Sequence, residues 1–166
     1  EGGLTQYSDL TSDMTVSTEP LPAYTLTYTA GEHGTISGTA PQTVNSGADG
    51  TPVTAVPDAG YHFVDWTPGG STLNPRTDTS VTADIAVTAN FALNTYTLTY
   101  TAGEHGTLSG TSPQTVNSGA DGTPVTAVPD DGYHFVDWTP GGSTLNPRMD
   151  TSVTADIAVT ANFALN

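Results

Sequence analysis

Tyr24-Thr25-Leu26-Thr27-Tyr28-Thr29 opens a stretch of sequence, Tyr24 to Asn94, that recurs almost letter for letter as Tyr96 to Asn166. Large apolar residues alternate with threonine in the opening run, and a period of two is typical of a half-buried β-strand. The offset between the copies is 96 − 24 = 72 residues. Only four aligned pairs differ, namely Ile36/Leu108, Ala40/Ser112, Ala59/Asp131 and Thr77/Met149. Near-identical tandem copies are typical of arrays that extend a stalk, a filament or a multivalent surface.

Further short runs of β-branched and aromatic residues follow within each copy, separated by turn residues at even intervals. In the first copy they lie at 35–37, 42–44, 51–56, 61–66 and 85–91. Thr, Gly and Pro oppose helices throughout, and no segment has the apolar spacing of a helix. The sequence therefore predicts an all-β fold with two tandem small β-sandwich or barrel-like domains. It leaves open whether each domain is an immunoglobulin-like sandwich or a grasp-like sheet that has lost its helix.

The repeat boundaries divide the chain into three parts. Residues 1–23 form an N-terminal extended segment, and the two β-repeat domains span residues 24–94 and 95–166. At the junction, Phe91 to Tyr96 passes from the last strand of one copy into the first strand of the next with about three residues between them. Because a linker of that length without Gly or Pro is not a flexible coil, we expect a stiff, extended pair with a fixed twist. We expect Leu93 to fill the interface between the domains.

Charge excludes several classes of partner. The chain has 17 acidic residues against two Arg and no Lys, for a net charge of −15. Phosphate binding needs clusters of Lys and Arg, so a nucleic-acid partner is excluded. No run approaches the 18 apolar residues of a transmembrane helix, so the sequence predicts no membrane span. The absence of Cys and Lys rules out disulfides and Lys–Asn isopeptide cross-links.

The stretch Gly60-Tyr61-His62-Phe63-Val64-Asp65-Trp66, which reads G-Y-x-F-x-x-W, resembles the core of divergent internalin-B-type repeats, also called bacterial repeat domains. The flanking segments are similar too, and they are Tyr24–Tyr28, Val53–Pro57, Asn74–Arg76 and Val87–Phe91. Residues 96–166 carry the same motifs, and 1–23 lie outside the resemblance. The resemblance implies a secreted or cell-surface bacterial protein with an architectural or adhesive role. It carries over no catalytic residue, because the family pattern has none.

Two interpretations compete for the aromatic residues of this motif. The predicted core motif consists of Tyr61, Phe63, Trp66 and Phe91, with Tyr133, Phe135, Trp138 and Phe163 in the second copy. A small domain needs such side chains in its core, because each contributes about 1.5–3 kcal/mol when it is buried. Alternatively, each Trp stacks on a sugar beside the acidic Asp65 or Asp137. We favour the core.

Neither metal binding nor catalysis has a recognisable motif in this sequence. No metal-ligand spacing of His, Asp or Glu occurs, so we expect no cofactor, with weak Ca²⁺ binding between Asp78 and Asp84 as the alternative. Catalysis would need paired carboxylates or a Ser-His-Asp group in a deep cleft, which domains of this size do not provide, so we expect no enzyme. We expect Arg76 and Arg148 to pair with Asp78 and Asp150, or else to dock on an acidic face of a neighbouring molecule.

The N-terminal segment allows two interpretations. Residues 13–18 alternate polar and apolar side chains, as a short strand does, so the segment is either a disordered leader or a strand that pairs with an open sheet edge. In the second case Leu10, Met14 and Val16 belong to a strand-addition segment that links copies head to tail. We therefore expect self-association or binding to other surface proteins in a non-enzymatic stalk or filament. The alternative is an adhesin that binds glycans through its tandem domains.

Overall fold

The computed structural model describes residues 20–166, and every regular element in that range is a β-strand. Repeat 1 contains β1 (Ala23–Ala30), β2 (Gly34–Ser37), β3 (Gln42–Asn45), β4 (Thr54–Pro57), β5 (Tyr61–Thr67) and β6 (Ile85–Leu93). Repeat 2 contains β7 (Thr95–Ala102), β8 (Gly106–Ser109), β9 (Gln114–Asn117), β10 (Thr126–Pro129), β11 (Tyr133–Thr139) and β12 (Ile157–Leu165). The prediction of an all-β chain with two similar units is confirmed. Leu10, Met14 and Val16 lie outside the described residues.

Each repeat has a four-stranded sheet and a two-stranded sheet. The larger sheet of repeat 1 has the order β3-β1-β6-β5, and β2 pairs with β4 in the smaller one. Repeat 2 has the same arrangement, with β9-β7-β12-β11 and β8-β10. The two central strands of each repeat, β1 with β6 and β7 with β12, are parallel, while the other pairs are antiparallel. Immunoglobulin sheets are antiparallel, so the parallel central pair distinguishes each repeat from an immunoglobulin sandwich.

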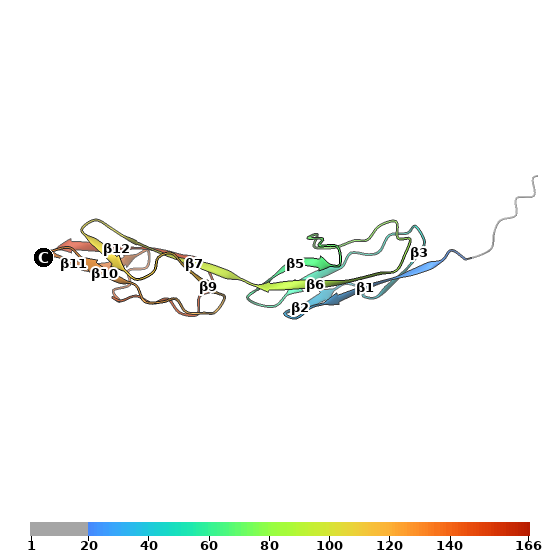
Figure 1. Cartoon of the computed structure of the whole chain (residues 1–166), viewed down its shortest axis with the longest axis horizontal. Helices are drawn as coiled ribbons and strands as arrows, with labels where there is room; N and C mark the ends of the chain where they lie inside the picture. The colour runs from blue at the N-terminus through green and yellow to red at the C-terminus, as the bar shows by residue number, and fades with distance from the viewer. Residues whose placement is uncertain (1–19) are drawn as a thin grey trace, which may run out of the picture.

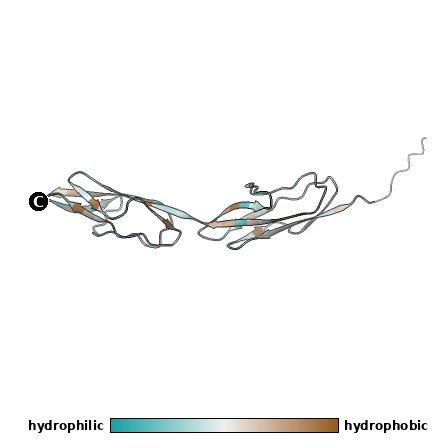
Figure 2. Cartoon of the chain, in the orientation of Figure 1, coloured by the Kyte–Doolittle hydropathy of each residue, from teal (hydrophilic) through white to brown (hydrophobic). Residues whose placement is uncertain are grey.

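The core of each repeat lies between its two sheets. In β1 the period of two places Leu26 and Tyr28 inside, 0% and 5% exposed, while the threonines that alternate with them are exposed. Figure 2 shows patches of apolar and polar residues along the strands of both repeats. Repeat 1 buries Leu26, Tyr28, Val53, Ala55, Trp66, Val81, Val87 and Ala89, and repeat 2 buries the eight equivalent residues. Because both sheets contribute, the core holds the two layers together.

One strand is shorter than the sequence indicated. The run 51–56 predicted a single strand, but only Thr54–Pro57 pairs with β2. Val53 instead exchanges backbone hydrogen bonds with Arg76, at 2.9 and 2.8 Å, and is fully buried. Val53 is therefore β-branched because it is buried, not because it belongs to β4. Its partner Arg76 lies in a loop, which the alternation of apolar and polar residues could not predict.

The two repeats lie end to end, and the strands meet at the junction (Figure 1). β6 ends at Leu93 and β7 begins at Thr95, so Asn94 is the single residue between them rather than the three that we expected. The difference arises because Leu93 still pairs with Tyr61, and Thr95 already pairs with Asn117. The chain thus passes from the middle of one sheet into the middle of the next.

Candidate functional site

Trp66 stands at the centre of the core of repeat 1. Its side chain is fully buried, and its indole N–H donates a hydrogen bond to the carbonyl of Leu73 at 3.0 Å. The Tyr28 ring meets it edge-on at 6.0 Å between centroids, and the Phe63 ring lies at 5.7 Å. Trp138 is equally buried in repeat 2. Neither indole therefore presents a face on which a sugar could stack.

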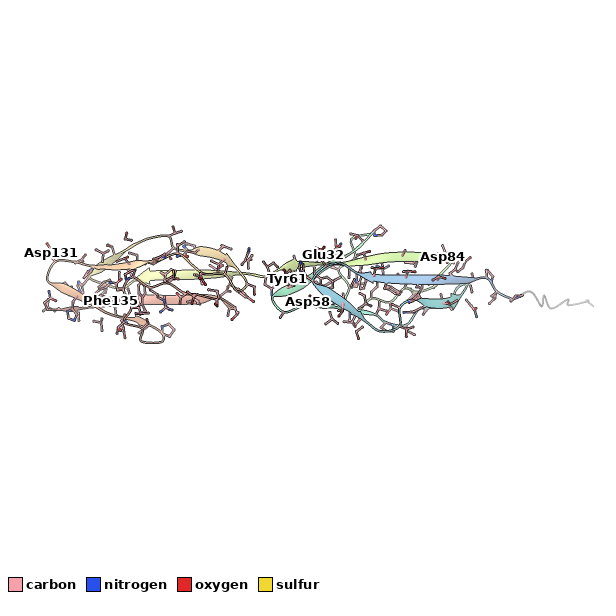
Figure 3. All side chains as sticks on the ribbon, turned by 90° about the horizontal axis from the view of Figure 1, so that it is seen from below. Glu32, Asp58, Tyr61, Asp84, Asp131 and Phe135 are labelled. Carbon is pink, nitrogen blue, oxygen red and sulfur yellow. The ribbon has the colours of Figure 1, made fainter. Side chains whose placement is uncertain are left out.

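The other aromatic residues of the motif lie around this ring or at its margin. Phe63 and Phe91 are partly buried and meet edge-on at 6.2 Å. The Phe91 ring lies against Gly34, where a Cβ atom would overlap it. Tyr61 is half-buried at the end of repeat 1 that adjoins repeat 2 (Figure 3), and the His33 ring stacks on it at 4.1 Å. In repeat 2, Phe135 and Phe163 pack on the core and Tyr133 stacks with His105.

The single Arg of each repeat forms an ion pair in a partly buried network. Arg76 donates from Nε to Asp78 Oδ2 at 2.8 Å and from a terminal nitrogen to Oδ1, in the bidentate geometry that guanidinium favours. The hydroxyl of Tyr28 donates to the same carboxylate at 2.8 Å. The guanidinium lies 5.9 Å from the centre of the Trp66 ring. The network thus attaches the loop after β5 to the core, and Arg148 and Asp150 repeat it.

The electrostatics of this network favour the charged carboxylate and the neutral phenol. Burial would raise the pKa of Asp78, but the hydrogen bonds from Arg76 and Tyr28 outweigh it and hold that pKa below its usual value. Burial and the hydrogen bond to Asp78 raise the pKa of Tyr28 well above its usual value. Both shifts stabilise the network at neutral pH.

The structure does not bring Asp78 and Asp84 together. Asp78 is bonded to Arg76 and Tyr28, whereas the Asp84 carboxylate accepts the backbone N–H of Thr25 at 2.8 Å. Asp84 lies at the end of repeat 1 away from the junction (Figure 3). Within residues 20–166, no three His, Asp or Glu side chains form a group that could hold a metal ion. Asp78 is therefore engaged by Arg76 and Tyr28, and Asp84 by the backbone of Thr25, so the two carboxylates do not share a partner.

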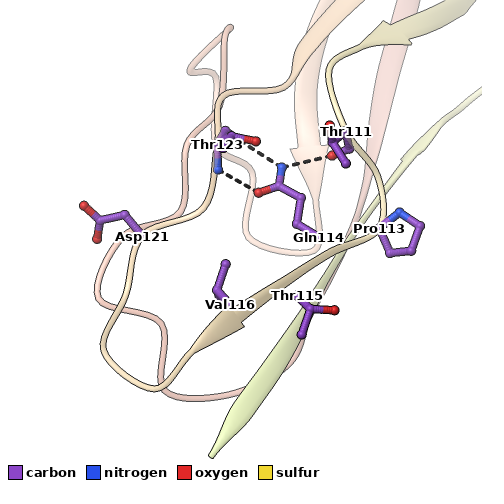
Figure 4. Close-up of a pocket in the computed structure, with 7 residues that line it drawn as sticks. All are labelled: Thr111, Pro113, Gln114, Thr115, Val116, Asp121 and Thr123. Atoms are coloured by element: carbon purple, nitrogen blue, oxygen red, sulfur yellow. Dashed lines mark hydrogen bonds between the residues drawn. The ribbon is translucent and has the colours of Figure 1, made fainter.

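A shallow groove of about 410 Å³ lies beside the edge strand β9 (Figure 4). It is lined by Thr111, Pro113, Gln114, Thr115, Val116, Asp121 and Thr123. The buried amide of Gln114 donates to the carbonyls of Thr111 and Thr123, both at 2.9 Å, and accepts the Thr123 N–H at 2.7 Å. Gln42 holds the corresponding loop of repeat 1. Since both ends of each amide are engaged, we interpret this side chain as a structural brace between edge strand and loop.

The junction is held by the backbone of Asn94. Its N–H donates to the carbonyl of Gly60 in repeat 1, and its carbonyl accepts the N–H of Ser118 in repeat 2, both at 2.8 Å. Its side-chain oxygen lies 2.8 Å from Nδ1 of His62. One residue is therefore bonded to both repeats, and its side chain is fixed as well.

Equivalent positions elsewhere in the chain show only half of this arrangement. Pro22, which corresponds to Asn94 by the offset of 72 residues, accepts the N–H of Ser46 at 2.7 Å. Asn166 donates its N–H to Gly132 at 2.9 Å. Each repeat thus offers one N–H donor, Ser46 or Ser118, and one carbonyl acceptor, Gly60 or Gly132. Of these three equivalent positions in residues 20–166, Asn94 alone bonds to the acceptor of one repeat and the donor of the next.

Burial at the junction follows the same pattern. Leu93 is half-buried, whereas the equivalent Leu165 at the far end of repeat 2 is 70% exposed. Gly60, with φ of 85°, lies so close to Ser118 that a Cβ atom would be 2.9 Å from its hydroxyl oxygen, while Gly132 has open space around it. Repeat 2 therefore covers the end of repeat 1, and Leu93 lies in the covered part. We take this interface as the candidate functional site.

Comparison with protein-family models places both repeats in one family. The model for the divergent InlB B-repeat domain matches residues 24–95 and again residues 96–166. The chain therefore belongs to the divergent InlB B-repeat domain family. Neither a search of curated proteins nor a search of solved structures found a match.

Family and fold together agree with a structural surface module that is not an enzyme, and with a location outside or on the surface of the cell. In the described part of the chain, no helix is long and apolar enough to cross a bilayer.

Sequence reasoning missed the residues that hold the junction. Asn94 and His62 carried no recognisable motif, because their partners are backbone groups and a side chain 32 positions away. The turn chemistry of Pro57 to Gly60 was visible, but not the contact of that turn with repeat 2. The one signal in the sequence was the lack of Gly and Pro between the repeats. It predicted a stiff junction, but not the hydrogen bonds of Asn94 that hold it.

Proposed function

We propose that this chain is a non-enzymatic structural module of an extracellular bacterial stalk or filament. The observation that carries the proposal is the junction, where Asn94 bonds to both repeats and Leu93 is partly covered. A linker of one residue with both backbone groups bonded has little freedom to bend. Successive repeats with this junction make a rod, which extends whatever is attached to its end. Proteolysis of intact producing cells should release the repeats, and their retention until lysis would contradict the extracellular location.

Assembly of such modules needs a sheet edge that is open to a further strand. β5 is a poor edge, because it carries a bulge between Phe63 and Asp65 and the Trp66 N–H and carbonyl are already bonded to Ser71 and Gly70. β11 shares these features in repeat 2, and β3 and β9 are the opposite outer strands of the two four-stranded sheets, with β1 and β7 on one side only. We infer that the N-terminal segment of one molecule, with Leu10, Met14 and Val16, adds a strand beside β3 or β9 of the next and so links copies head to tail.

Removal of residues 1–19 tests this assembly. The cut should stop there because Pro22 accepts a hydrogen bond from Ser46 and β1 begins at Ala23. The truncated chain should stay folded and monomeric in light scattering, while the full chain forms longer species. A triple change of Leu10, Met14 and Val16 to Ser should act like the deletion, whereas the polar-face change Thr15→Ala should not. Equal polymerisation of the truncated and full chains would refute strand addition.

Charge adds a condition to the same experiment. At −15 per chain, copies repel each other over the distance that salt leaves unscreened, about 10 Å at 0.1 M. Assembly should therefore increase as salt is raised, and the effect should be the same for any monovalent salt. Stronger assembly with Ca²⁺ at equal ionic strength would instead indicate bound Ca²⁺ between copies.

The alternative function is an adhesin or carbohydrate-binding module. One observation favours it, the stacked pair of His33 and Tyr61, which recurs as His105 and Tyr133 with both His exposed. Exposed rings in two copies suit weak multivalent binding of sugars. A glycan array probed with the full chain and with a His33→Ala/His105→Ala variant distinguishes the two functions. Binding that the variant loses supports the adhesin, and no binding on the array supports the purely structural role.

A further inference from the structure

The first and last strands of each repeat lie side by side and run in the same direction. In repeat 1, β1 and β6 form five residue pairs, from Leu26↔Ile85 to Ala30↔Ala89. In repeat 2, β7 and β12 pair in the same register. The chain enters each repeat at the start of the first strand and leaves it at the end of the last. Any pull along the chain therefore reaches a repeat through these two strands.

We propose that this parallel pair is a mechanical clamp that lets each repeat resist tension along the chain. A pull between Ala23 and Leu93 moves β1 and β6 in opposite directions along one axis, so the strands must slide past each other. All five pairs then carry the force together and must break together. If the same strands were pulled apart from one end, the pairs would break one after another under a lower force. The proposal rests on the proposed role of the repeats in a surface stalk, which transmits tension between cell and target.

The clamp is reinforced at both of its ends. At the first pair, the Asp84 carboxylate accepts the backbone N–H of Thr25 at 2.8 Å, one residue before the parallel ladder begins. Beyond the last pair, the N–H of Gly31 donates to the carbonyl of Ala89 at 2.9 Å. Sliding of β1 along β6 must break these two bonds as well as the ladder itself.

Burial protects the clamp from water. On the core face the two strands place Leu26, Tyr28, Val87 and Ala89, all at most 5% exposed, and Ile85, which is partly buried against the core. Neither strand is an edge, because β3 flanks β1 and β5 flanks β6. Backbone groups in such a position cannot exchange a protein partner for water until the strands have moved, so the bonds must break before water replaces them.

The junction places the two clamps in series. β6 leaves the first clamp and, with Asn94 alone between them, continues as β7 in the second. Tension therefore passes from one parallel pair to the next along a single extended segment. No loop lies between the clamps that would lengthen first under load.

Single-molecule pulling of the full chain along two directions tests the proposal. The chain has no Cys, so introduced cysteines define the attachment points. One variant carries Ala23→Cys and Thr95→Cys, which load the strands in shear. The other carries Ala23→Cys and Ala83→Cys, which pull the same strands apart from their first pair. All three positions are exposed. The released length, about 3.3–3.6 Å per residue, identifies the unfolding of repeat 1 in each case.

We expect the unfolding force to be several-fold higher in shear than in the other direction, since forced unfolding follows the barrier along the direction of pull. Equal forces in the two directions, or a lower force in shear, would overturn the proposal. Urea midpoints of both variants equal to that of the unchanged chain show that neither cysteine pair weakens the fold. In the shear variant, Asp84→Ala should lower the force while the exposed Asp58→Ala should leave it unchanged. Failure of the clamp leaves the release and assembly experiments of the proposed function unaffected, so the two can fail separately.

Discussion

At Asp78, burial and hydrogen bonding act on the carboxylate in opposite directions, and hydrogen bonding prevails. Because the pKa of Asp78 is lower in the folded chain than in the unfolded chain, its contribution to stability is complete above the unfolded value of 3.8. That contribution is lost as the pH falls below about 4, when the unfolded carboxyl takes up a proton first. Asp150 behaves in the same way in repeat 2.

We therefore expect Asp78→Asn with Asp150→Asn to reduce both the stability at pH 7 and its loss in acid. Removing a hydrogen-bonded charge beside Arg costs roughly 2 kcal/mol per repeat, because the guanidinium keeps no charged partner. Urea unfolding at pH 7 and pH 3 measures both effects. The exposed turn pair Asp58→Asn with Asp130→Asn is the control. A double Asn variant as stable as the unchanged protein at pH 7 would show that the ion pair contributes nothing.

Tyr28 and Tyr100 make stability depend on pH at the alkaline end of the range. The pKa of each phenol is raised in the fold, so the stability that the neutral hydroxyl provides is present below pH 10, the usual value. It is lost above pH 10, where the unfolded phenol ionises and the folded one does not. Tyr28→Phe with Tyr100→Phe should flatten the decline of stability between pH 10 and pH 11. An unchanged alkaline decline in this variant would contradict the assigned hydrogen bonds.

One of the four differences between the repeats has a clear structural effect. The hydroxyl of Ser112 accepts the N–H of Tyr100 at 2.8 Å and donates to its carbonyl at 2.7 Å. Ala40 has no hydroxyl to make these bonds with Tyr28. Ala40→Ser should stabilise repeat 1 by about 1 kcal/mol, and Ser112→Ala should destabilise repeat 2 by a similar amount. Hydrogen exchange of the Tyr28 and Tyr100 amides measures the effect of the hydroxyl. Equal protection of the two amides in the unchanged chain would show that the Ser112 bonds add nothing.

At the scale of the elements, the contrast between Leu93 and Leu165 isolates the junction. The two residues end equivalent strands, but repeat 2 covers only the first. Leu93→Ser should cost about 1–2 kcal/mol, because it removes partly buried apolar surface from the interface. Leu165→Ser should stay within about 0.5 kcal/mol, as is usual at the surface. Urea unfolding compares the two variants, and equal costs would mean that the repeats do not support each other.

The sequence predicted the elements better than their partners. The period of two in Tyr24–Thr29 and the aromatic run at Tyr61 indicated strands, and the structure forms β1 and β5 there. The parallel pairing of β1 with β6 could not be predicted, because the two strands lie about 60 residues apart and alternation does not encode a partner. Val53 shows the same limit, since its partner lies in a loop. The bonds of Asn94 depend on backbone groups, which leave no trace in side-chain patterns.

At the scale of the whole molecule, rigidity follows from the sum of these local features. β6 of the first sheet leads into β7 of the second, and Asn94 between them is bonded to each repeat. Figure 1 shows the result as an extended pair with the C-terminus at the far end from β1. This architecture supports the proposed role as a rigid spacer in a surface stalk or filament.

The distance between the repeats in solution tests this claim most directly. Spin labels on Thr43→Cys and Thr115→Cys, which occupy equivalent exposed positions in β3 and β9, report it by electron paramagnetic resonance. The account predicts one narrow distance distribution for the chain as it stands. It predicts a broad distribution once Gly-Gly-Ser is inserted after Asn94. A broad distribution without the insertion would show that the repeats move independently and would contradict the account.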